Sequence, residues 1–170
     1  MAKLITVFGA TGAQGKSVAE ALLGVGGYKV RAPTRSPDSS EAKSLGEKGC
    51  EVVQVDMDST DSLEKAITGS YGMFADANYW GLLAKSEDTV MDSEIRNKQG
   101  RAIWDDVCKK TGVKHLVYCG MEHVEPTLGK PHFIDNGIVE KYLDEIKVPN
   151  TSTHIPFSTM KAPQVQPTEE

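Results

Sequence analysis

The chain has 170 residues, of which 39% are hydrophobic, and a formal net charge of -5 at pH 7. This length suits one domain with a hydrophobic core and is short for two. The acidic balance, without a cluster of Lys and Arg, argues against nucleic acid or an anionic membrane as a partner, because both are recognised through clustered positive charge.

Short apolar runs alternate with helical stretches along the chain. The helical spacing is clearest at Val18, Ala21, Leu22 and Val25, which places four apolar side chains on one helix face. No apolar run approaches the roughly 20 residues that a helix needs to cross a bilayer. The strands are predicted at residues 4–8, 28–32, 51–55, 72–75, 114–119 and 151–155, and further helices at 62–67 and 88–110.

This alternation predicts the fold class. Strands joined through helices form a parallel sheet covered on both faces, because parallel neighbours need a crossover. Near-continuous apolar strands agree with burial on both faces. We therefore predict an α/β, doubly wound parallel sheet of the Rossmann type over residues 1–156. The proline-containing segment 157–170 is predicted to be a loosely ordered tail, with the C-terminal substrate lobe largely absent.

A glycine-rich turn with the spacing Gly-x-x-Gly-x-x-Gly follows the first predicted strand. Gly9 would allow a tight turn, Gly12 would let the backbone approach a pyrophosphate, and Gly15 would let the next helix pack closely. Three glycines could also form a merely flexible turn, but a position between strand and helix favours dinucleotide binding. The predicted cofactor contacts here are Gly9, Thr11, Gly12, Ala13, Gln14 and Gly15.

The end of the second predicted strand indicates which dinucleotide binds. An NAD site places Asp or Glu about 20 residues beyond the glycines, whereas Arg accommodates a 2′-phosphate. Here Arg35 stands between Thr34 and Ser36, and no acid follows until Asp38. Arg35 with the two neighbouring hydroxyls therefore predicts NADP(H). The alternative is a solvated surface arginine.

Several motifs in this order resemble the NmrA-like family of atypical short-chain dehydrogenases, from about residue 3 to about residue 156. The resemblance implies NADP(H), with the glycine-rich turn on the pyrophosphate and Arg35 on the 2′-phosphate. Asp56 and Met57 lie within one motif and are predicted cofactor contacts, and Asn78 is a candidate for hydrogen bonding to cofactor or substrate. The motifs are GATGAQG at 9–15, VRAPTR at 30–35, VDM at 55–57, NYW at 78–80, QG at 99–100 and VKHLVY at 113–118.

The usual catalytic pair of short-chain reductases is missing. None of the five tyrosines has a lysine four residues later, and Asn136 stands where NmrA-like reductases often carry Lys. The loop after the fifth predicted strand instead holds Glu122 and His123. Desolvation beside a nicotinamide would raise the pKa of Glu122 and make it a general acid, with His123 to shuttle or orient. The alternative is that both are ordinary solvated loop residues.

Two functions remain open from the sequence. One is an enzyme that acts on a small, largely apolar metabolite, by reduction or by a cofactor-assisted isomerisation. The other is a non-catalytic NADP(H) sensor that acts through contacts with a protein partner. Family chains commonly continue into a C-terminal lobe, so a homodimer is predicted as one way to close the pocket.

The cysteines bear on the cellular compartment. Cys50, Cys108 and Cys119 are an odd number without metal-ligand spacing, which predicts reduced thiols and no metal site. The first residues enter a strand pattern without a charged-then-apolar leader. Both features predict a cytoplasmic protein.

Overall fold

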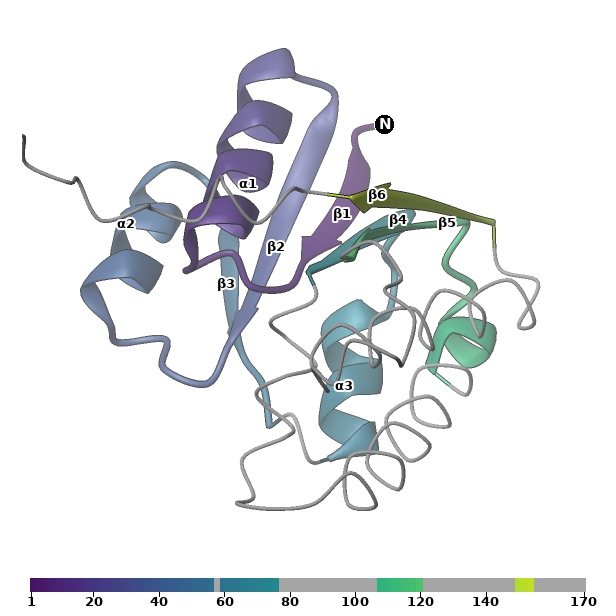
Figure 1. The fold of residues 1–170 in the computed structure, drawn as a ribbon. Coiled ribbons are helices and arrows are strands. Elements are labelled where there is room, and N and C mark those ends of the chain that lie inside the picture. The colour runs from purple at the N-terminus through teal and green to yellow at the C-terminus, as the bar shows by residue number, and fades with distance from the viewer. Residues whose placement is uncertain (57–58, 77–106, 121–148, 155–170) are drawn as a thin grey trace, which may run out of the picture.

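The structure, a computed structural model, describes residues 1–56, 59–76, 107–120 and 149–154. They contain one parallel sheet of six strands in the order β3-β2-β1-β4-β5-β6 (Figure 1). This confirms the predicted doubly wound α/β fold. The strands are β1 (Lys3–Val7), β2 (Tyr28–Thr34), β3 (Glu51–Gln54), β4 (Gly72–Asp76), β5 (His115–Gly120) and β6 (Asn150–His154).

Helices cover both faces of the sheet. α1 (Ala13–Val25) and α2 (Ser40–Glu47) lie on one face, and α3 (Thr60–Ile67) lies on the other with helical residues 107–111. Because every strand is parallel, each connecting helix runs back against the strands and begins near their carboxyl ends. The helix starts and the strand ends therefore meet at one edge of the sheet.

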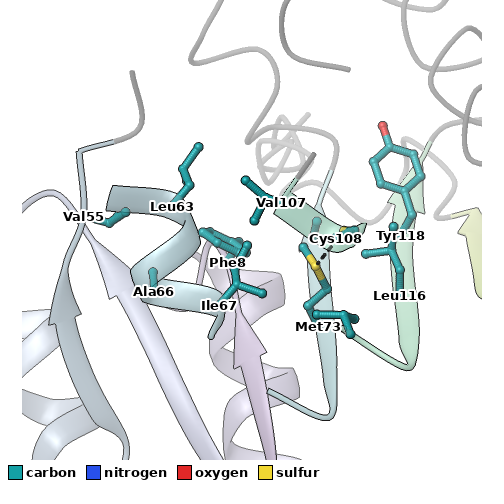
Figure 2. Packing of buried hydrophobic residues seen from close by; sticks show 12 residues of the cluster. Phe8, Val55, Leu63, Ala66, Ile67, Met73, Val107, Cys108, Leu116 and Tyr118 are labelled. Carbon is teal, nitrogen blue, oxygen red and sulfur yellow. Dashed lines mark hydrogen bonds between the residues drawn. The ribbon is translucent and has the colours of Figure 1, made fainter. Parts of the chain in front are cut away.

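Each face of the sheet has its own hydrophobic cluster. Phe74 of β4 joins Ala19 and Leu45 under α1 and α2, whereas its neighbours Met73 and Ala75 join the cluster under α3. Figure 2 shows this second cluster, with side chains from α3 and from residues 107–111 packed over β4 and β5. The alternation along β4 follows the two-residue period of a strand. Each helical layer is thus held to the sheet by its own apolar contacts.

Two strands depart from the expected pattern. β2 continues through Pro33, where the sequence predicted an end at Ala32; Pro33 lies opposite Val53, and the N–H of Val55 donates to the carbonyl of Thr34 at 3.0 Å. β6 differs from the apolar, buried strands that were expected, because Thr151, Ser152 and Thr153 are polar and exposed. In β2, Pro33 fixes φ at a value that extended backbone tolerates, so the strand continues to Thr34.

α2 was not predicted from the sequence, because it buries only Ala42 and Leu45 and so shows little apolar periodicity. The signal that marks it is a cap: the side chain of Ser39 accepts a hydrogen bond from the N–H of Ala42. The predicted tail and most of the predicted helix 88–110 lie outside the described residues. Within the part that is described, no helix is long and apolar enough to cross a membrane.

Candidate functional site

The glycine-rich turn brings the start of α1 against the end of β1. Gly9 has a positive φ of 71°, and its carbonyl accepts the N–H of Gly12 at 2.8 Å. A Cβ on Gly15 would lie 2.3 Å from the oxygen of Gly9 and 2.7 Å from the nitrogen of Ala10, which no real contact permits. The predicted backbone roles of Gly9 and Gly15 are therefore confirmed.

The start of α1 differs from the starts of α2 and α3. Ser39 and Ser59 cap α2 and α3 through their side chains, and each of these helices has an acid in its first turn. The N-cap of α1 is Gly12, which has no side chain to act as a cap, and the first turn of α1 contains no acid. The first N–H groups of a helix have no partner within the helix. Since no side chain of the described residues caps α1, these groups and the partial positive charge of the helix end are open there to another acceptor.

Arg35 lies at the same edge, directly after β2. It is exposed, and within the described ranges its side chain has no ion pair or hydrogen bond. The hydroxyl of Thr34 accepts the N–H of Ser36 at 3.2 Å and so shapes the turn that carries Arg35. Arg35 thus lies at the sheet edge where α1 begins, and within the described ranges its donors are available to an anion.

Arg31 has a different role, which no sequence pattern indicated. Its Nε donates to Oε2 of Glu51 at 3.1 Å, and its Nη1 donates to the carbonyls of Ala66 and Thr68 at 3.0 and 2.9 Å. It therefore ties β2 to β3 and satisfies carbonyls at the end of α3. Only tertiary contacts distinguish this structural arginine from Arg35.

The remaining predicted site residues divide into two groups. Asp56 follows β3 at the same edge as the glycine-rich turn; it is exposed, and its N–H donates to the hydroxyl of Ser62 at 2.9 Å. Met57, Asn78, Glu122 and His123 lie outside the described residues. The strands that lead toward the last three, β4 and β5, end at Asp76 and Gly120 on that edge.

Strand order places this edge in context. From β1 the chain proceeds to β2 on one side, and it later returns to β4 on the other side of β1. Open α/β sheets bind ligands outside the carboxyl ends of the strands at such a reversal, and the glycine-rich turn lies there. Among the residues with described positions, no group of three His, Cys, Asp or Glu side chains could hold a metal ion.

A parallel sheet of this order, with a glycine-rich turn at its reversal, defines a Rossmann-type fold of the nucleotide-binding class. Comparison with known proteins gives the family. The NmrA-like family matches residues 1–165, and the chain belongs to it.

Curated relatives and solved structures agree with this assignment. The NmrA-like family domain-containing oxidoreductase cpsB of Aspergillus campestris is 37% identical over 115 residues, which cover 68% of this chain and 33% of the relative. The chain thus spans about a third of the length of the first curated relatives it matches.

Two solved structures share the fold and hold the cofactor that the sequence predicts. An NADPH-dependent quinone oxidoreductase from Escherichia coli, complexed with NADPH, has a TM-score of 0.66 at 22% identity and covers 88% of this chain and 48% of its own. NmrA, a negative transcriptional regulator in complex with NADP, has a TM-score of 0.66 at 20% identity, with 90% and 45% covered.

Proposed function

We propose that this chain binds NADP(H) at the carboxyl edge of its sheet and acts as an NmrA-like oxidoreductase on a small, largely apolar metabolite. The observation that carries the proposal is the uncapped start of α1 at the same sheet edge as Arg35, which has no side-chain partner among the described residues. Two further curated relatives are also named oxidoreductases, and the match to this chain covers 38% and 41% of their length. The regulator in complex with NADP supports a second candidate, a sensor that binds the cofactor without chemistry.

The described residues fit a dinucleotide. A Cβ on Gly12 would meet the oxygen of Gly9 at 3.3 Å and no side chain of the described residues within 4 Å. A pyrophosphate could therefore approach the N–H groups of Ala13 and Gln14, while Gly15 lets α1 pack close to the end of β1. Arg35, with the hydroxyls of Thr34 and Ser36, would hold the 2′-phosphate. Asp56, at the end of β3, would contact the adenosine half. When bound, the nicotinamide supplies hydride.

Binding and turnover of the purified protein test the proposal together. We expect calorimetric titration to give at least tenfold tighter binding of NADPH than of NADH, which corresponds to about 1.4 kcal/mol. The NADPH complex is then incubated with candidate metabolites while absorbance and product mass are followed. Product with consumed NADPH indicates a reductase, and product with unchanged absorbance indicates an isomerase. Tight binding without any product favours the sensor, and absence of binding contradicts the whole proposal.

Glu122 remains the proposed general acid, with His123 as the group that orients or relays the proton. Replacing Glu122 with Gln keeps the size of the side chain and removes its acidic proton. We expect Glu122→Gln to lower kcat by about 100-fold, the lower end for general acid catalysis, and to leave the Kd for NADPH unchanged. Steady-state kinetics and titration measure the two quantities. Unaltered kcat in this variant would remove Glu122 from the mechanism.

A further inference from the structure

The ion pair between α1 and α2 shows how these two helices face each other. Nζ of Lys48, at the end of α2, lies 2.6 Å from Oε1 of Glu20 in α1. The two helices lie on the same face of the sheet, and both begin at its carboxyl edge (Figure 1). The side of α1 that carries Glu20 is therefore directed toward α2.

Lys16 lies one turn before Glu20 on the same side of α1, because residues four apart share a helix face. It is therefore closer to the carboxyl edge and is directed toward the start of α2, which follows Arg35 in the chain. Lys16 is exposed, and across the described ranges it has no ion pair. Its ammonium group, on a flexible four-carbon stem, can move toward a ligand.

The charges around Lys16 support this placement. The pKa of the Glu41 carboxyl, in the first turn of α2, is lowered by a hydrogen bond from its own backbone, by one from the hydroxyl of Ser40, and by the positive charge of Lys16. The positive charge of Lys16 therefore reaches the carboxylate in the first turn of α2. A cation in the first turn is unfavourable for an isolated helix. A bound anion near the start of α1 would offset the repulsion between Lys16 and the positive helix end. Lys16 in turn would offset the negative charge of Glu41, which would otherwise repel that anion.

We propose that Lys16 is a second ligand of the cofactor's 2′-phosphate, on the side of that group opposite Arg35. This inference rests on the proposed function, because it needs NADP(H) in the site. Arg35 approaches the phosphate from the end of β2, and Lys16 approaches it from the first turn of α1. NADH lacks the phosphate, so Lys16 contributes to the choice between the two cofactors and not to dinucleotide binding in general.

The experiment compares Kd values for NADPH and NADH in the wild type and in Lys16→Met, which keeps the length of the side chain and removes its charge. We expect NADPH to bind about tenfold more weakly and NADH to bind as before, as for one lost charge-assisted contact. Lys29→Met is the matched control: Lys29 is exposed at the start of β2, at the opposite edge of the sheet. It should change neither Kd.

Each failure has its own signature. If Lys16→Met leaves the NADPH affinity unchanged while the wild type still prefers NADPH, Lys16 is no phosphate ligand and the proposed function stands. Equal weakening for both cofactors, or an equal effect of Lys29→Met, would likewise overturn the role of Lys16. A wild type without NADPH preference overturns the proposed cofactor itself. Circular dichroism and the urea midpoint of each variant establish that the protein is folded.

Discussion

Gly15→Ala is expected to lower the free energy of unfolding by about 3 kcal/mol, the upper end of what overpacking costs. The added Cβ would lie 2.3 Å from the oxygen of Gly9 and 2.5 Å from its carbonyl carbon. Both are backbone atoms that cannot swing aside, so α1 must move away from the end of β1. The same movement would displace the N–H groups proposed to hold the pyrophosphate, and we expect NADPH binding to be lost as well.

Gly24 provides the matched control within the same helix. A Cβ on Gly24 meets no atom of the described residues within 4 Å, and Gly24 lies near the end of α1. Gly24→Ala should therefore stabilise the protein slightly, by about 0.5 kcal/mol, because Ala restricts the unfolded chain more than Gly. Urea unfolding measures both variants. If Gly15→Ala is as stable as Gly24→Ala, the close contact between α1 and β1 is not present in solution.

Arg35→Glu is expected to weaken NADPH binding by about 100-fold, because a charge-assisted contact is lost and a repulsive carboxylate replaces it. NADH has no 2′-phosphate, so its affinity should stay the same or rise. Arg35 is exposed and has no described side-chain partner, so the urea midpoint should not change. Titration of both cofactors gives the result, and equal weakening of NADPH and NADH would contradict the role of Arg35.

Arg31→Met separates a structural arginine from a binding one. This substitution removes the bonds to Glu51, Ala66 and Thr68 and leaves two carbonyls without that donor. We expect a loss of about 2 kcal/mol in unfolding free energy, as for hydrogen bonds to a charged group. The ratio of the two cofactor affinities should stay at the wild-type value. A change in that ratio without a loss of stability would mean that the two arginines have been assigned the wrong way round.

Local signals predicted most of the fold. The glycine spacing at Gly9 and Gly15 could be interpreted correctly because a positive φ and a close helix contact are demands of the immediate backbone. The parallel order followed from alternating strands and helices. α2 escaped because a short helix with two buried residues has almost no periodicity, and only the Ser39 cap marks its start.

The site was less predictable because it depends on contacts between distant segments. Arg31 and Arg35 are the same residue type four positions apart, and their roles separate only when β3 and the end of α3 meet Arg31. Lys16 gave no signal in the sequence, because its direction toward α2 depends on how two helices pack. Glu122 and His123 stay predictions, since their role depends on a pocket that the described residues do not include.

The buried cysteines allow the two faces of the sheet to be followed independently. Cys50 and Cys119 lie in the cluster under α1 and α2, Cys108 lies in the cluster under α3, and none of the three is in a disulfide. Burial, and then the negative charge of Glu20, raise the pKa of the Cys50 thiol, so it reacts slowly while covered. An alkylating reagent reaches each thiol only after its helical layer opens, so labelling of Cys50 and Cys119 reports opening on one face and labelling of Cys108 reports opening on the other. The native chain thus carries Cys50 and Cys119 as chemical reporters for the face that holds α1, and Cys108 for the opposite face, without any engineered residue.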